Sequence, residues 1–437
     1  MRWFTRAARI LGVAALPALA AGCARESRPN LLLISLDTTR ADHLSAYGYA
    51  QPTSPNLARL AAEGTLFEQA RAHVPSTLPS HATLFTGLLP PSHGVRCNGR
   101  MRLPESAETL AETLSTAGWR TGAVLGAFPL EHRFGLAQGF AWYDDAFGAE
   151  PRPGAGSGFW LGNSYDAFER DAAQVTDRAL AEVAKGSGPW FVFAHYFDAH
   201  QPYAPPAEER ARFVSPYDGE IAFVDRQVGR LVDAVLARAP DTLVVIVGDH
   251  GESLGEHGEE WHNRYLYDAT LHVPLIVVWP RHVAAGRRVT TAVGLVDLMP
   301  TILDLFALPP MRRTDGRSLA RGLTGDGKVE PRDQYAETLV WRYEESKGIE
   351  VRALLSEGFK VIETRSPRPQ EEGVELYESA TDPSETANLA ATQAERTRAL
   401  SQHLRHWSEG LERRGAPLEA LPLDPEAEKK LKSLGYL

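Results

Sequence analysis

The chain has 437 residues, of which 43% are hydrophobic and 23% are charged, and its formal net charge is −10 at pH 7. This length allows one large domain and a second, smaller one, each with a buried core of its own. The negative charge argues against nucleic acid as a partner, because binding to a phosphate backbone needs a basic surface.

The first 22 residues have the pattern of a processing segment. Three arginines precede the apolar run ILGVAALPALAAG, which is short for a membrane-spanning helix. The run ends before Cys23, at the place where bacterial lipoprotein signals carry the cysteine that is lipidated. We therefore expect export to the periplasmic side of a bacterial cell envelope, with a lipid anchor at Cys23 as the only membrane contact. A plain secretory signal or an uncleaved anchor is the alternative. Cys97 would then lack a partner for an intrachain disulfide.

Hydrophobic periodicity predicts strands and helices in alternation after this segment. NLLLISLD is continuously apolar and ends in an acid, which is typical of a buried parallel strand. SPNLARLAAEG has the signals of a helix, with serine at the N-cap, proline in the first turn and glycine after the end. The expected elements are strands at 30–37, 121–128, 189–198, 242–249 and 272–280, and helices at 54–64, 109–118, 171–186 and 219–239.

This alternation implies right-handed crossovers and predicts an α/β fold, with a large, mostly parallel sheet covered on both faces. After about residue 325 the pattern changes to short strands and a long amphipathic helix within 387–414, which indicates a smaller C-terminal α+β subdomain. We predict a signal segment at 1–22, a catalytic domain at 23–325 and the subdomain at 326–437.

Several metal-ligating side chains follow the predicted strands. Asp37 ends the first strand, the pair Asp249 and His250 ends TLVVIVGD, and His200 follows PWFVFAHYFD. Ligands of open α/β sheets bind beyond the carboxyl ends of the strands, so these groups are expected to converge. Two carboxylates, an imidazole and a threonine oxygen predict one divalent cation, with zinc favoured over manganese or calcium. Taken singly, each residue has a plainer interpretation as a cap or a turn residue.

The stretch VPSTLPSHATLFTG offers three hydroxyls that could attack a substrate, namely Ser76, Thr77 and Ser80. Pro79 can occupy the first turn of a helix through SHATLFTG, which would place Thr77 just before the helix N-terminus. The positive end of the helix dipole and a nearby metal would favour its alkoxide form. The alternative is that Ser76 and Thr77 are simple capping residues.

At this point the chain resembles the sulfatase family of the alkaline phosphatase superfamily. Five segments carry the resemblance, in the family's order: NLLLISLDTTRADHLSAYGY, TLPSHATLFTGLLPPSHGV, FDAHQPYAPP, VGDHGESLGEHGEEWHNRYLYDATLHVPLIV and ELYESATDPSETANLA. The resemblance implies an alkaline phosphatase/sulfatase-like α/β sandwich with a smaller C-terminal sheet domain. It also implies a metal-dependent hydrolase.

The resemblance also assigns roles to residues. Asp37, Asp249 and His250 fall on metal-ligand positions, and Thr77 falls on the position of the nucleophile and touches the metal. His200 and His262 would contact the transferred group or protonate the leaving oxygen. Candidate substrate contacts are His81, His257, Arg264 and Lys360. The alternatives are that His257 orients its loop and that Lys360 is a solvated lysine. A second metal at Asp198, His200 and His262 is conceivable, but their spacing departs from the two-zinc pattern, so a single site is expected. His43, His73, His93 and His195 are expected to be structural, with His195 the best candidate for a supporting contact.

One departure from the family pattern affects the chemistry. Sulfatases carry Cys (or Ser)-x-Pro-x-Arg, whose first residue is oxidised to formylglycine, whereas this chain has Thr77-Leu78-Pro79-Ser80-His81. Threonine cannot form that aldehyde, so no formylglycine is expected. Thr38 also stands where many sulfatases have a second acidic ligand.

A threonine ester must be broken by a second displacement, which phosphoryl centres tolerate when a metal assists. The sequence therefore predicts a threonine-nucleophile branch that hydrolyses a phosphoric or phosphonic ester, or less favourably a sulfuric ester, of a small molecule, glycan or lipid. One alternative is a transferase that moves a phospho-head-group, such as phosphoethanolamine, to an envelope glycan or lipid. Another is a non-catalytic binding protein of the same fold, which the retained metal ligands disfavour.

Overall fold

The structure is a computed structural model that describes residues 28–147, 159–160, 163–164, 169–325, 327–339 and 348–433. The predicted signal segment and Cys23 lie outside the described residues. Within the described part of the chain, no helix is long and apolar enough to cross a membrane.

An eight-stranded sheet forms the centre of the fold, in the order β12-β2-β11-β9-β1-β8-β4-β5. β1 (Asn30–Leu36) lies between β8 (Trp190–Tyr196) and β9 (Thr242–Gly248) and runs parallel to both. The other five strands are β2 (Thr65–Phe67), β4 (Arg120–Val124), β5 (Trp142–Asp144), β11 (Leu275–Val278) and β12 (Arg287–Val289). Only the pairs of β11 with β9 and with β2 are antiparallel, so the prediction of a large, mostly parallel sheet is confirmed.

The predicted strand at 272–280 is interrupted at Pro274. Its first part, β10 (His272–Val273), pairs with β3 (Ala70–Arg71) in a separate three-stranded sheet that also contains β13 (Val293–Gly294), and its second part is β11. Proline has no N–H to donate to a strand ladder, which explains a change of partner at this residue.

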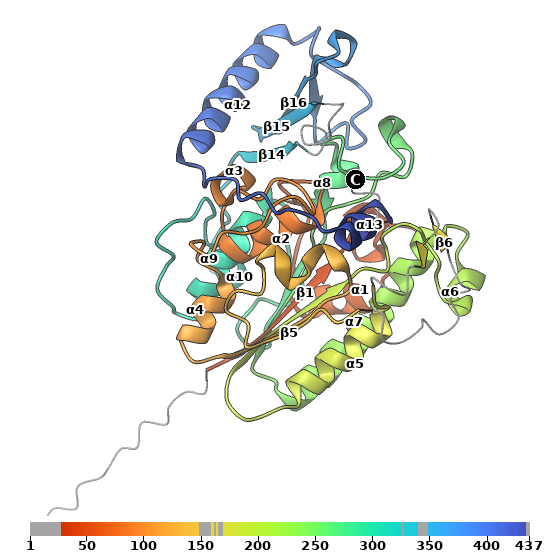
Figure 1. The fold of residues 1–437 in the computed structure, drawn as a ribbon, viewed down its shortest axis with the longest axis vertical. Helices are drawn as coiled ribbons and strands as arrows, with labels where there is room; N and C mark the ends of the chain where they lie inside the picture. The colour runs from red at the N-terminus through yellow and green to blue at the C-terminus, as the bar shows by residue number, and fades with distance from the viewer. Residues whose placement is uncertain are drawn as a thin grey trace, which may run out of the picture.

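Helices cover both faces of the sheet (Figure 1). One hydrophobic core joins alternate residues of β1, such as Leu32 and Ile34, to α1 (Pro55–Glu63), α5 (Ala172–Val183) and α7 (Pro216–Arg238). The opposite core contains Leu31 and Leu33 and the helices α2 (Thr77–Thr86), α4 (Leu110–Thr116) and α9 (Leu298–Leu305). Successive side chains of a strand point to opposite faces, so a continuously apolar strand supplies both cores.

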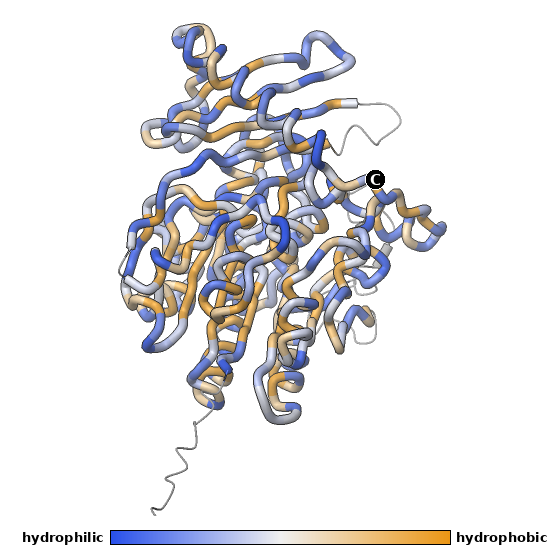
Figure 2. Tube along the Cα trace, turned by 90° about the vertical axis from the view of Figure 1, so that its left-hand side faces the viewer, coloured by the Kyte–Doolittle hydropathy of each residue, from blue (hydrophilic) through white to orange (hydrophobic). Residues whose placement is uncertain are grey.

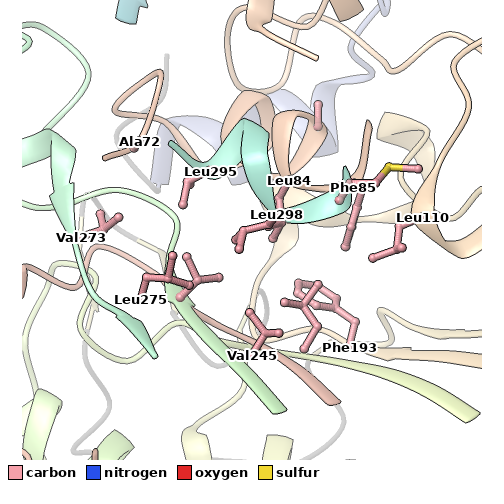
Figure 3. Close-up of a cluster of buried hydrophobic side chains, with 14 of the residues drawn as sticks. Ala72, Leu84, Phe85, Leu110, Phe193, Val245, Val273, Leu275, Leu295 and Leu298 are labelled. Atoms are coloured by element: carbon pink, nitrogen blue, oxygen red, sulfur yellow. The ribbon is translucent and has the colours of Figure 1, made fainter. Parts of the chain in front are cut away.

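Figure 3 shows how α2 is held against the sheet. Leu84 and Phe85 of α2 point toward Val245 of β9 and Phe193 of β8, and the rings of Phe85 and Phe193 meet edge to face with centroids 4.9 Å apart. Hydrophobic segments gather along the strands of the sheet, as the hydropathy colouring of Figure 2 shows. This packing fixes the position of the helix that begins at Thr77.

The C-terminal part is an antiparallel sheet of four strands in chain order, covered by a helix, at the top of Figure 1. The strands are β14 (Gln334–Thr338), β15 (Glu350–Ser356), β16 (Phe359–Arg365) and β17 (Gly373–Glu378), and the helix is α12 (Ala394–Arg414). Leu404 and Leu411 of α12 pack on Leu354, Val361 and Leu376. The predicted α+β subdomain is therefore present.

The last helix was not anticipated from the sequence. α13 (Pro425–Ser433) leaves the C-terminal sheet and returns to the catalytic domain, where Ala427 and Leu431 join the core that contains Met101. An antiparallel bridge between Met101 and Ala420 guides this return. The segment after α12 thus packs on the large domain and not on the subdomain to which the sequence assigned it.

Lys360 does not serve as the substrate contact that the sequence suggested, because its ammonium is enclosed by an ion cluster. Its side chain is 2% exposed, and Nζ lies 2.8 Å from Asp268 Oδ1 and 2.8 Å from Glu385 Oε1. Arg71 of β3 binds the same Asp268 carboxylate at 2.6 Å. The cluster joins the C-terminal sheet to the catalytic domain, so we reassign Lys360 to the attachment of the subdomain.

We expect Lys360→Met to lower the free energy of unfolding by about 3 kcal/mol or more, because it leaves the buried carboxylate of Glu385 without its cation. Urea unfolding of the full chain measures the change. Lys432→Met removes an ion pair between two half-exposed side chains, Lys432 and Glu428, and should change the unfolding midpoint very little. Equal midpoints for the two variants would contradict a role for the buried cluster.

Candidate active site

Three candidate metal ligands meet at the carboxyl edge of the central sheet. Asp37 follows β1, and Asp249 and His250 follow β9, the strand beside it. His250 Nε2 lies 3.5 Å from Asp249 Oδ2 and 4.0 Å from Asp37 Oδ1. One ligand atom from each residue lies within 4.8 Å of the other two, which is compatible with shared coordination of one cation.

The hydrogen bonds around these ligands leave their inward-facing atoms available. Asp37 Oδ1 and Asp249 Oδ2 are buried and have no hydrogen-bond partner within the described ranges. His250 donates its Nδ1–H to the carbonyl of Gly251 at 2.9 Å, which leaves a lone pair on Nε2. Burial raises the pKa of both carboxyl groups well above the usual range, and the negative charge of Asp37 raises the pKa of Asp249 further. This donor set fits a divalent cation of zinc or manganese type, which would compensate the two buried carboxylates.

Thr77 is the hydroxyl that the structure places beside these ligands. Its Oγ1 lies 3.4 Å from His250 Nε2, and the residue is completely buried. The helix begins at Thr77 itself, one position earlier than expected, with Ser76 in extended conformation before it. Ser80 instead donates its hydroxyl to the carbonyl of Asp249 at 2.6 Å. Of the three hydroxyls considered from the sequence, Thr77 is therefore the one brought to the ligand His250.

His195 supports the metal ligands from behind. Its Nδ1 accepts the N–H of Gly126 at 3.3 Å, so its Nε2–H donates to Asp37 Oδ2 at 3.0 Å. Burial lowers the pKa of His195 to about 3, so the ring is neutral and this tautomer is retained. The contact orients Asp37 and leaves its other oxygen facing His250.

His81 lies beneath Thr77 and does not face a substrate. Its Nδ1–H donates to the Thr77 carbonyl at 2.7 Å, and its Nε2 accepts from the Ser35 hydroxyl at 2.8 Å. The side chain is completely buried and both ring nitrogens are engaged. We therefore replace the expected substrate contact by a positioning role, in which His81 fixes the first turn of α2.

Two further histidines lie next to His250. The ring of His262 has its centroid 4.6 Å from that of His250 and 5.2 Å from that of His200. His262 donates its Nδ1–H to Glu252 Oε1 at 3.0 Å, and His200 donates its Nδ1–H to the carbonyl of Gln201 at 2.6 Å. Burial lowers the pKa of His262 to about 3 and that of His200 well below its usual range. Both rings are therefore neutral, and each presents an unprotonated Nε2. The structure thus brings the predicted catalytic histidines together with the metal ligands.

Two residues of this site were missed in the sequence. Glu252, which is completely buried, orients His262, and Asn98 accepts the Leu78 N–H at 2.7 Å with its Oδ1. The Nδ2 of Asn98 is buried and has no hydrogen-bond partner among the residues described. Glu252 follows His250 by two positions in the segment GDHGES, which is a usable signal, whereas nothing in CNGR marks Asn98.

The remaining candidates lie in the loop after the metal ligands and around it. His257 stacks on Tyr267 with ring centroids 3.5 Å apart, and its Nε2–H donates to the carbonyl of Ser384 at 3.2 Å. This attaches the loop to the C-terminal part, which is the orienting role that the sequence offered as one interpretation.

The guanidinium of Arg264 lies 4.9 Å from the ring centroid of Tyr265, and its role in substrate binding stays a prediction. Asp198 accepts the N–H of Ala172, and across the described ranges only Asp37, Asp249 and His250 form a three-ligand group.

We expect Glu252→Ala to lower kcat by about 10- to 100-fold, because His262 loses the acceptor that holds its tautomer. Steady-state kinetics as a function of pH measure the effect. The acid limb of the pH–rate profile should move, because His262 loses its hydrogen bond to Glu252. Glu252→Gln keeps an acceptor oxygen and should recover part of the rate. Glu260→Ala, at an exposed position of the same loop, is the control. An unchanged pH profile in Glu252→Ala would contradict this role.

Comparison with known proteins agrees with the geometry. The family model described as Sulfatase matches residues 29–308, which is more than half of the chain. The chain belongs to the sulfatase family. A second model, described as N-sulphoglucosamine sulphohydrolase, C-terminal, matches residues 255–411. This sulfatase-family protein is a hydrolase of ester bonds, and its family is generally metal-dependent.

Human arylsulfatase A is 28% identical over 373 residues, which are 71% of this chain and 71% of the relative. Among solved structures, phosphonate monoester hydrolase of Agrobacterium radiobacter superposes with a TM-score of 0.71 at 22% identity, covering 88% of this chain and 96% of that one. A structure in complex with its substrate D-glucosamine-2-N,6-O-disulfate superposes with a TM-score of 0.72 at 19% identity, covering 88% and 98%. These superpositions confirm the sulfatase-like fold of this protein.

Proposed function

We propose that this sulfatase-family protein hydrolyses a phosphoric or phosphonic ester, with zinc favoured as its single metal and unmodified Thr77 as the nucleophile. The observation that carries the proposal is the threonine hydroxyl 3.4 Å from His250 Nε2, at the start of a helix. The sequence resemblance aligns this threonine with the family's modified cysteine. The leader sequence and Cys23 favour a location in the cell envelope.

The argument for a phosphorus centre is chemical. A formylglycine hydrate releases sulfate by collapsing to the aldehyde, so the sulfur need not be attacked a second time. The ester of Thr77 cannot collapse to an aldehyde, so water must attack the phosphorus or sulfur atom to cleave it. Phosphorus esters tolerate this second displacement. The fold neighbours include two phosphonate monoester hydrolases, with TM-scores of 0.71 and 0.69, which supports this substrate class without deciding it.

In the first step, Thr77 Oγ1 forms a bond to phosphorus, the bond from phosphorus to the leaving oxygen breaks, and the hydroxyl proton is released. Asp37, Asp249 and His250 would hold a cation, whose positive charge would favour the alkoxide form of Thr77. The neutral Nε2 of His262, held by Glu252, is suited to carry the proton to the leaving oxygen. In the second step, water adds to phosphorus, the Thr77 ester bond breaks, and the proton of water returns to Thr77 Oγ1.

A hydrolysis panel with the purified full chain tests the substrate class. We expect turnover of an aryl phosphodiester or phosphonate monoester to exceed that of an aryl sulfate in the presence of Zn²⁺, Mn²⁺ or Ca²⁺. Dominant sulfate turnover would overturn the argument from the missing aldehyde. If the protein binds metal but hydrolyses none of the esters, this result would instead favour the phospho-head-group transferase, whose segment GDHGESLGE this chain shares.

A further inference from the structure

Two adjoining cavities lie away from the metal ligands, where the loop around α10 (Ala320–Leu323) approaches the C-terminal sheet. The smaller has a volume of about 310 Å³ and the larger about 730 Å³. Ala292 and Arg332 line both cavities, so the two cavities adjoin, and we call the pair the α10 groove. Thr77 and the candidate metal ligands line neither cavity.

The smaller cavity is lined by four cations, namely Arg317, Arg321, Lys328 and Arg332. The first three are exposed, and none of them forms an ion pair with a carboxylate in the part of the chain that the structure describes. The lining carboxylates are Asp297 and Glu330. A concentration of unpaired cations in one hollow of a chain with net charge −10 focuses a positive potential there and favours an anionic ligand.

Among the described residues that line this cavity, one carboxylate is buried, and arginine already neutralises it. Asp297 is completely buried, and its Oδ1 accepts from Arg332 Nη1 at 2.7 Å and from the Arg317 N–H at 2.9 Å. Arg332 also donates its Nη2–H to the carbonyl of Asp315 at 3.0 Å. The backbone that carries Arg317 is therefore held in place before a ligand arrives, which lowers the entropic cost of binding.

The larger cavity has a different lining, which is rich in hydroxyl groups. Thr290, Ser356 and Ser379 line it, and their hydroxyls make no hydrogen bond within the described residues. Gln69 adds an amide to the same wall. Such a surface can exchange hydrogen bonds with a polyol, because each hydroxyl both donates and accepts.

We propose that the α10 groove binds an anionic oligosaccharide. Its sulfate, phosphate or carboxylate group lies among Arg317, Arg321 and Lys328, and its sugar hydroxyls lie along the larger cavity. Guanidinium groups bind such oxyanions through paired N–H donors, which suits the two arginines. This site is separate from the hydrolytic centre and does not depend on the reaction proposed for it.

Calorimetric titration of the metal-loaded full chain tests the site. The ligands are a chondroitin sulfate hexasaccharide, inorganic sulfate and neutral maltohexaose, each at about 150 mM NaCl so that weak long-range attraction is screened. We expect saturable binding of the sulfated hexasaccharide only. The triple variant Arg317→Gln, Arg321→Gln, Lys328→Gln should bind it at least about tenfold more weakly. Hydrolysis of a small aryl ester should be unchanged in this variant.

A variant with the same change of charge provides the control. Arg238→Gln, Arg281→Gln, Arg398→Gln removes three exposed cations at scattered places and should bind like the wild type. Equal weakening in both variants would overturn the proposal in favour of non-specific attraction. Binding that survives in the groove variant, or no saturable binding to the wild type, would also overturn it. Inorganic sulfate binding as tightly as the hexasaccharide would overturn the assignment of an oligosaccharide.

Discussion

Replacement of Thr77 by alanine is expected to lower kcat by about 10⁴-fold or more, because the variant lacks the oxygen that forms the covalent intermediate. The hydroxyl lies 3.4 Å from His250 Nε2, and the residue is completely buried, so the hydroxyl is shielded from bulk water. Turnover of the best ester from the hydrolysis panel measures the effect. The bound metal, measured in parallel, should stay near the wild-type level, because Asp37, Asp249 and His250 are unchanged.

The neighbouring hydroxyls are matched controls for this result. Thr77→Ser keeps the oxygen and should retain a measurable fraction of the rate, whereas Ser76→Ala removes a buried hydroxyl that forms no hydrogen bond within the described residues. Rapid quenching followed by mass spectrometry should find the transferred group on the peptide that contains Thr77. A fully active Thr77→Ala enzyme, or an inactive Ser76→Ala enzyme with normal folding, would refute Thr77 as the nucleophile.

Removal of the metal by a chelator is expected to abolish turnover and to lower the melting temperature by about 5 °C or more. Asp37 and Asp249 are each about 1% exposed, and no arginine or lysine pairs with either among the residues that the structure describes. Two adjacent buried carboxylates are costly without a cation. Differential scanning calorimetry with and without chelator, followed by addition of Zn²⁺, measures the loss and its reversal.

The variant His250→Ala separates metal loss from other effects of the chelator. It removes one of the three ligands, so its melting temperature should respond much less to chelation than that of the wild type. The response should also be small for the neutral substitution Asp249→Asn. Superimposable melting curves of the wild type with and without chelator would contradict a structural contribution of the metal.

The main strands and the ligands at their ends could be predicted because both signals are local. A run such as NLLLISL is apolar at every position, and this pattern suits a strand buried on both faces whatever its neighbours are. An acid at the end of such a strand is then placed at the sheet edge by the strand itself. For this reason the sequence alone predicts Asp37, Asp249 and His250 as ligands, and the family motifs indicate the same residues.

Other features depend on which distant segments meet, and periodicity carries no information about that. Lys360 and Asp268 form an ion pair across two domains, and His195 reaches Asp37 from the neighbouring strand. Histidine is a residue type that often contacts substrates, but His81 points into the core. The face of α2 that carries His81 packs against the sheet, where His81 contacts Ser35 of β1. The return of α13 to the catalytic domain follows from hydrophobic contacts of Leu431 that exist only once both parts are folded. The residue types at the site are thus local properties of the chain, whereas the orientation and partners of each side chain come from long-range packing.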